Sequence, residues 1–545
     1  MFYVPVLQMD LPRIYQYEGL FSSNRSLDLS LKVLFVLHCF ILLLFVVARH
    51  YARKSYKRAP LIKIDTLSTY SDVYSSELPE SKLSETKDDV ATIKLSRNYV
   101  LCVNDWKRIT LYDHSPDFEC FYSAAPKSLR RQWYGLLLSD ATLPHRSELR
   151  SVLLHAFDSF PNKTYETIGS LSSNIHSVDR YLSGLGHLDS HGFDDWLWYI
   201  VSEFLFFNAM EFGDSHLARD KKAQLTHELK KNIAVLSDYH VYGLQKKTAT
   251  SHKHASEELL ETLDDILLPL IEFSRLYTLH KSSSTNKKKD SSNLLCQLNR
   301  VRARMEMEGE PVEFLADSHT VHILAELSFM LHWILKRHLV VLFGCLSHKP
   351  SWEKRLASEV QEVFGNTGRI WKSKNDQLPT CLLLHQTQVL VWTKALIIET
   401  MRICSPSWPF GCFRQATRDG KLNDWDYLED ELILFNQPAY MFDRHLWRTE
   451  GDDPLTFNPS RFVNSAPNGA SKPRLKLPVH FARFLLTGYT VCIPHESVYR
   501  LLISIVSHLY FTGWRVQQST VIDDSLERYL ILNPIVFTPI CAPLD

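Results

Sequence analysis

The sequence lacks several features that would place it in a common class of protein. Lys and Arg together number 61, as do Asp and Glu, so the formal net charge is zero. This balance disfavours a globally basic nucleic-acid-binding protein, and we expect no nucleic-acid partner. The 10 cysteines among 545 residues form no CxxC pair and no zinc-type spacing. We therefore predict a reducing compartment, without a disulfide framework, in which most thiols are buried.

Long hydrophobic runs are also scarce, and the run near the N-terminus is the one that we expect to cross a membrane. Residues 29–48 would span about 30 Å of hydrocarbon as a helix, and basic residues follow it. The positive-inside rule keeps that basic cluster in the cytosol. We predict a lumenal segment at 1–28, an anchor at 29–48 that contacts membrane lipid, a basic linker at 49–64 and a cytosolic domain at 65–545. A cleaved signal peptide is the alternative, less well matched by the position of the charges.

The remaining chain is predicted to be mainly helical with a minor β component. Hydrophobic residues at helical spacing predict helices at 194–211, 256–279, 351–364 and 389–403, and short strands are predicted at 415–440 and 515–543. The tract 315–346 is apolar on most faces but contains Glu326, Lys336 and Arg337. We therefore expect a buried core helix there rather than a second membrane span.

Four motifs follow one another between Pro350 and Pro494. They are the helix that follows Pro350, Glu399-Thr400-Met401-Arg402, Phe457-Asn458-Pro459-Ser460-Arg461-Phe462, and Thr487-Gly488-Tyr489-Thr490-Val491-Cys492-Ile493-Pro494. Each is unspecific alone, but their order resembles that of the cytochrome P450 family. The resemblance implies a mainly α fold of that family with a minor β domain, and haem b as the cofactor.

The resemblance also implies roles for individual residues. Glu399, Arg402 and Arg461 would form a buried structural network, for which the planar guanidinium of arginine is suited. Cys492 would be the axial ligand of the haem iron. We expect a helix to begin near His495, so that its N-terminus favours the thiolate, and Gly488 permits a tight turn beside the porphyrin.

Haem propionates need cationic partners, and two arginines are candidates. Arg414 matches the family's arginine after the Glu-x-x-Arg helix, and Arg131, or its neighbour Arg130, is a weaker match to an arginine on an earlier helix. The cysteine loop departs from the family at Leu485, Thr490 and Pro494, where phenylalanine, arginine and glycine are usual.

The tract 315–346 corresponds by its position before Pro350 to the family's oxygen-binding helix, and it departs further from the family pattern. We assign no catalytic residue there. Counting back from Pro350 places residues 330–334 where the family has an acid and an alcohol, and in this register His332 is the candidate for proton delivery. In the alternative register, which places residues 316–320 there, Thr320 is the candidate.

The function that the resemblance implies is that of a haem-thiolate monooxygenase. It would insert one oxygen atom from O2 into an apolar small molecule and receive electrons from a membrane NADPH-dependent flavoprotein reductase at the endoplasmic reticulum. One alternative is a haem-thiolate isomerase or dehydratase that needs no reductase. Another is a non-catalytic membrane protein that retains the fold.

Overall fold

The computed structural model describes part of the chain in detail. The described residues are 59, 61–62, 89–95, 98–105, 115, 118–120, 146–158, 190–202, 204–205, 227, 230–231, 260–272, 275, 294–364, 389–404, 413–447, 453–454, 456–464, 473–487, 489–490, 493–511, 513–516 and 537–539. The predicted anchor at 29–48 lies outside them. Two compact units are distinguished, and in the smaller one (1–58 and Lys421–Asp426) the described part is Lys421–Asp426, where Lys421 pairs with Asp426. All that follows concerns the larger unit, apart from the strand pair 420–422 with 425–427, most of which lies in the smaller one.

The described part of the larger unit is mainly helical, as predicted. Its long helices are α6 (Arg146–Asp158), α8 (Ser190–Ser202), α11 (Leu294–Glu308), α12 (Asp317–His348), α13 (Pro350–Phe364), α15 (Val391–Ile403), α18 (Val479–Thr487) and α19 (His495–Phe511). Residues 260–272 are also helical. The short helices are η4 (Glu313–Leu315), α16 (Gln437–Met441), α17 (Arg444–Trp447) and η6 (Pro459–Phe462). The helices predicted at 351–364 and 389–403 and near His495 are thus confirmed, whereas α8 begins four residues before the predicted Asp194.

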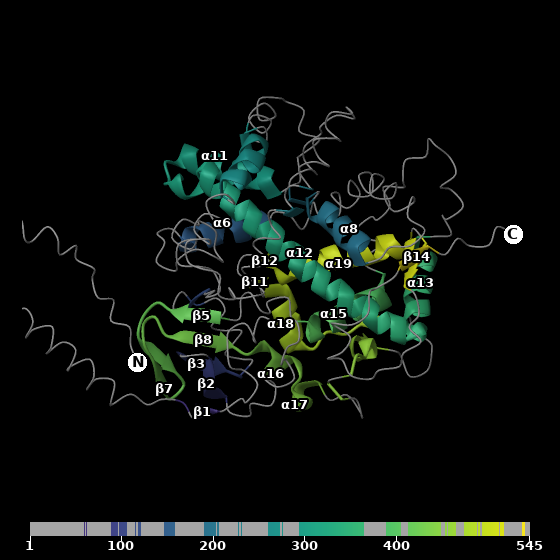
Figure 1. Cartoon of the computed structure of the whole chain (residues 1–545). Coiled ribbons are helices and arrows are strands. Elements are labelled where there is room, and N and C mark those ends of the chain that lie inside the picture. Colours follow the sequence, from purple (N-terminus) through teal and green to yellow (C-terminus); the bar gives the residue numbers. More distant parts are fainter. Residues whose placement is uncertain are drawn as a thin grey trace, which may run out of the picture. The chain divides into compact units, whose positions relative to one another are not determined.

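Helix α12 lies at the centre of the helical part. It packs against α8, α13, α15 and α19, and Figure 1 shows it crossing the picture beside them. Among the described residues it is the one helix long and apolar enough to cross a membrane, but 72% of its apolar window is buried inside the protein. The expectation of a core helix is therefore confirmed, because its apolar faces are covered by other helices.

Strands from distant parts of the chain form one six-stranded sheet. Its order is β1 (Leu61–Ile62), β2 (Val90–Leu95), β3 (Asn98–Val103), β8 (Leu432–Phe435), β5 (Phe413–Ala416) and β4 (Phe118–Cys120). β3 pairs in parallel with β8, and β8 pairs antiparallel with β5. Strand β1 lies within the range predicted as linker. Strand β8 lies within the range 415–440, where short strands were predicted, and confirms that prediction.

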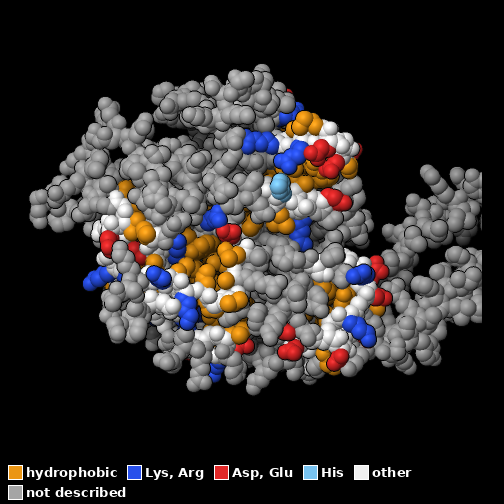
Figure 2. All heavy atoms as spheres, turned by 180° about the vertical axis from the view of Figure 1, so that it is seen from behind, with side chains coloured by type: hydrophobic (Ala, Val, Ile, Leu, Met, Phe, Trp, Pro, Cys, Tyr) orange, Lys and Arg blue, Asp and Glu red, His pale blue; other side chains and the backbone are white. Residues whose placement is uncertain are grey.

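Four antiparallel strand pairs complete the described β structure. They are β6 (Gly420–Leu422) with β7 (Trp425–Tyr427), β9 (Val463–Asn464) with β10 (Arg474–Leu475), β11 (Tyr489–Thr490) with β12 (Ile493–Pro494), and β13 (Trp514–Val516) with β14 (Phe537–Pro539). On the surface, Figure 2 shows hydrophobic side chains bordered by Lys and Arg on the face seen from behind.

Candidate functional site

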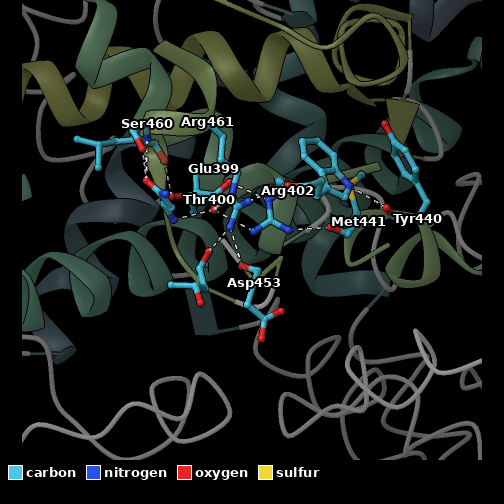
Figure 3. A network of polar contacts seen from close by, with 12 residues as sticks. Glu399, Thr400, Arg402, Tyr440, Met441, Asp453, Ser460 and Arg461 are labelled. Carbon is cyan, nitrogen blue, oxygen red and sulfur yellow. Dashed lines mark hydrogen bonds and ion pairs between the residues drawn. The ribbon is translucent and has the colours of Figure 1, made fainter. Parts of the chain in front are cut away.

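A buried ion pair lies on helix α15, which is itself buried along nearly its whole length. Glu399 and Arg402 are three residues apart and therefore share one face. Arg402 Nε donates to Glu399 Oε2 at 2.7 Å, and Arg402 Nη2 donates to Oε1 at 2.9 Å. Arg402 Nη1 donates to the backbone oxygen of Met441 at 2.7 Å. The planar guanidinium thus uses both edges, one on the carboxylate and one on α16 (Figure 3).

Arg461 joins this pair from the short helix η6. Asn458 caps that helix, since its side chain accepts from Ser460 N at 3.1 Å, and Pro459 occupies a first-turn position. Arg461 Nε lies 3.4 Å from Glu399 Oε1, and Asn458 N donates to the same oxygen at 2.9 Å. The structure therefore brings the three predicted network residues together.

The rest of the Arg461 guanidinium holds the chain segment before η6. Nη1 donates to the oxygen of Trp447 at 2.9 Å, and Nη2 donates to the oxygens of Asp453 and Thr456 at 2.7 and 3.1 Å. A single side chain thus ties α17, the following segment and α15 into one cluster.

The network is almost completely removed from water. Side-chain exposure is 0% for Glu399 and Arg402 and 2% for Arg461. Phe442 and Trp447 lie beside the Arg402 guanidinium, with ring centroids 5.7 and 5.2 Å from its central carbon. Because buried charges are tolerated only when they are paired and hydrogen-bonded, the network fixes the relative positions of α15, α16 and η6.

Cys492 and Gly488 lie outside the described residues, but the segments around them are described. Thr490 of β11 pairs with Ile493 of β12, and these two strands flank Cys492 in the sequence. Helix α19 begins at His495, directly after β12. His495 Nδ1 lies 3.0 Å from the oxygen of Phe484, which ties the start of α19 to α18.

Arg414 lies on β5 and is completely buried. Its Nη1 donates to the oxygen of Phe413 at 3.3 Å, and its guanidinium carbon lies 5.5 Å from the centroid of Phe435. Arg131, the other predicted propionate partner, lies outside the described residues.

A further arginine, Arg150, was not identified from the sequence. It lies on α6, and α6 packs against β12, the strand that directly follows Cys492. In the sequence, an acidic residue in the first turn and apolar residues at helical spacing after it are the signals that residues 146–158 form a helix. Nothing in that pattern indicates that the helix would meet the cysteine segment.

The two candidates for proton delivery occupy different places on α12. His332 Nε2 lies 3.2 Å from Asp194 Oδ1 on α8. Its ring stacks on Trp198, with centroids 4.0 Å apart and planes 10° apart. Lys336 Nζ donates to the same carboxylate at 2.6 Å. His332 is therefore directed at α8.

The directions of the pKa shifts favour a neutral His332 imidazole beside a charged Asp194 carboxylate. Burial lowers the pKa of His332, and the attraction of Asp194 only partly opposes this effect. Burial also acts against ionisation of Asp194, but its hydrogen bonds and attraction to His332 and Lys336 lower the pKa of that carboxyl overall.

Thr320, the other candidate, lies in the first turn of α12 and donates its hydroxyl to the oxygen of Leu315 at 3.3 Å. Asp317, at the start of the same helix, is held by Arg275 Nη1 at 2.7 Å and by Arg302. This end of α12 is thus fixed by ion pairs to other helices. Proton delivery by either His332 or Thr320 stays a prediction.

Comparison with known proteins identifies the family. The family model of cytochrome P450 matches residues 75–478, most of the chain, and the protein therefore belongs to the cytochrome P450 family. No curated protein matches the chain significantly. The family implies a haem cofactor and an oxidoreductase of the haem-thiolate oxygenase type, and its members generally use reductases and apolar substrates. The match ends before Cys492.

The chemistry of the described residues fits haem. Haem carries two propionates, and a completely buried guanidinium such as that of Arg414 is stable only among hydrogen-bond acceptors or anions. Arg150 brings a second guanidinium on a helix that packs against β12. Among the described residues no three His, Cys, Asp or Glu side chains gather as a separate metal site.

Proposed function

We propose that this protein is a haem-thiolate monooxygenase in which Cys492 is the axial ligand. The observation that carries the proposal is the position of α19, which begins at His495 after the β11–β12 pair that brackets Cys492. Backbone N–H groups and the positive end of the helix dipole stabilise a thiolate near a helix N-terminus. The family's substrates support an apolar small molecule as substrate.

In this proposal the chain holds the cofactor and keeps its surroundings rigid. When bound, haem supplies the activation of O2 and the transfer of one oxygen atom to the substrate. Arg414 and Arg150 would bind the propionates, and Glu399, Arg402 and Arg461 would hold the core beside the cysteine segment. Electrons would come from a membrane NADPH-dependent flavoprotein reductase. The predicted anchor at 29–48, in a single pass at the endoplasmic reticulum membrane, would place both proteins on one surface.

The first test is the absorption spectrum of the reduced, carbon monoxide-bound protein. We expect the strongly red-shifted band of thiolate-ligated haem, and we expect Cys492→Ala to abolish it. Cys102→Ala is the matched control. Cys102 is fully buried, burial raises the pKa of its thiol to about 12, and its Sγ donates to Asn104. Haem without the red-shifted band in the unmodified protein would refute thiolate ligation. Absence of haem would favour the non-catalytic alternative.

One observation favours a second candidate, a haem-thiolate isomerase or dehydratase. Residues 330–334 contain neither an acid nor an alcohol, and His332 is directed at Asp194 and Trp198 of α8. If this register is the functional one, α12 supplies no acid or alcohol that could deliver protons to bound O2. A reaction on a substrate that already contains the reactive oxygen does not require that delivery, because no O2 is cleaved. Turnover of an organic peroxide without reductase, NADPH or O2 would support this candidate. Strict dependence on all three would exclude it.

A further inference from the structure

The N-terminus of α15 has no capping side chain of its own. Its N-cap residue is Leu390, whose side chain is apolar and makes no capping hydrogen bond. The first backbone N–H groups of a helix have no partner within the helix, and leaving them unpaired in the protein interior is unfavourable. α15 is such a buried helix, so its first turn needs acceptors from elsewhere.

Glu359 of the preceding helix α13 provides these acceptors. Its Oε1 accepts from Trp392 N at 2.8 Å, and its Oε2 accepts from Thr393 N at 2.7 Å. Oε2 also accepts from the Thr393 hydroxyl at 2.8 Å. One carboxylate therefore pairs two consecutive N–H groups, and its negative charge lies at the positive end of the helix dipole.

The same face of α13 makes further contacts with this turn. Trp352, Arg355 and Glu359 follow one another at spacings of three and four residues and so share one helical face. The Arg355 guanidinium carbon lies 3.9 Å from the centroid of Trp392, and the ring of Trp352 lies 5.5 Å from that of Trp392. This face of α13 thus holds the start of α15 in place.

The contacts of Trp352, Arg355 and Glu359 are made to the helix that carries the buried ion pair. Glu399 lies six residues after Thr393, or about 9 Å along a helix that rises about 1.5 Å per residue. α15 is held at its start by Glu359 and near its end by Asn458, Met441 and Arg461. A shift or rotation at the start would be transmitted along the rigid helix to these contacts.

We propose that Glu359 is a positioning residue for the haem site. By pairing the first N–H groups of α15, it sets the axial position and rotation at which Glu399 and Arg402 meet Met441, Asn458 and Arg461. The consequence for haem rests on the proposed function, whereas the consequence for α15 does not.

Glu359→Gln is the principal variant, because it keeps the shape but replaces one of the two acceptor oxygens by an NH2 group, which cannot accept from a backbone N–H. Glu362→Gln is the matched control, since Glu362 is an exposed carboxylate on the same helix. Thr393→Val removes one of the three hydrogen bonds and is the milder variant. The full chain is used in detergent, under conditions where circular dichroism shows unchanged helix content.

The first readout is amide hydrogen exchange along α15. In Glu359→Gln we expect at least tenfold faster exchange at Trp392 and Thr393 and a smaller acceleration at 399–403. Thr393→Val should act in the same direction, and the two substitutions together should be less than additive, because they remove parts of one interaction. Exchange in both variants equal to that in Glu362→Gln would overturn the proposal.

The second readout is the carbon monoxide spectrum. In Glu359→Gln we expect the fraction of haem with the thiolate band to fall at least twofold while helix content is unchanged. Faster exchange with an unchanged spectrum would overturn the link to the haem site. If the unmodified protein has no thiolate band, the proposed function fails, and the exchange data still decide whether Glu359 positions α15.

Discussion

Replacing Glu399 by glutamine should strongly destabilise the protein, although the two side chains have nearly the same shape. Glu399 accepts two hydrogen bonds from Arg402, one from Asn458 N and a longer one from Arg461. The amide removes the negative charge and turns one acceptor into a donor that faces donors. Arg402 and Arg461 are then left buried without their anion, and breaking a buried ion pair in this way typically costs about 3–5 kcal/mol.

The assay is denaturant unfolding of the unmodified protein and of Glu399→Gln, with Glu496→Gln as the control. Glu496 pairs with Arg500 one turn later on α19, and these side chains are 31% and 19% exposed. Because a partly exposed surface pair of this kind contributes about 0.2–1 kcal/mol, the control should change little. A loss below about 1 kcal/mol in Glu399→Gln would refute the reasoning that a desolvated charge network holds α15 and η6 together.

Three further predictions concern pH, packing and a helix start. Burial lowers the pKa of His338 from 6.5 to about 3. As the pH falls below 6.5, this histidine therefore binds a proton in the unfolded chain before it does so in the folded protein. The unfolding free energy should therefore drop as pH is lowered from 6.5 to 4, and His338→Gln should reduce that slope by about 1.4 kcal/mol per pH unit in urea titrations. A Cβ at Gly420 would overlap the Tyr427 hydroxyl. Since Tyr427 is buried, Gly420→Ala should lower the free energy of unfolding by about 1–3 kcal/mol in the same assay. An unchanged unfolding midpoint would contradict the overlap. Asp317→Asn weakens two partly exposed ion pairs at the start of α12. It should cost only about 1 kcal/mol at low salt, with a smaller loss at high salt.

The elements that the sequence predicted well have local signals. Pro350 marks the start of α13, and α15 and α19 have apolar residues at helical spacing, so their existence follows from the chain itself. The core position of α12 follows in the same way, because charges interrupt a run that is otherwise apolar on most faces. The pairing of Glu399 with Arg402 is also local, since three residues separate them.

The remaining site features depend on which elements pack together, and a single sequence does not specify this. Periodicity shows that Arg150 is on a helix, but not that the helix meets β12. The spacing along the helix places His332 on α12, but does not show that its side chain lies against Asp194. Glu359 has the pattern of an ordinary surface carboxylate, and its role at Trp392 and Thr393 arises only from the approach of two helices.

The pairing of β3 with β8 also sets a time scale for biosynthesis. Just beyond these strands, Asn436 Nδ2 donates to Asn104 Oδ1 at 2.7 Å across a sequence separation of 332 residues. At about 5–20 residues per second, roughly 17–66 s separate the synthesis of the two strands. If the β2–β3 hairpin forms during that interval, the edge of β3 that pairs with β8 is left open, and an open edge is a template for aggregation. We therefore expect the nascent chain to require a chaperone at this edge until Phe435 has left the ribosome.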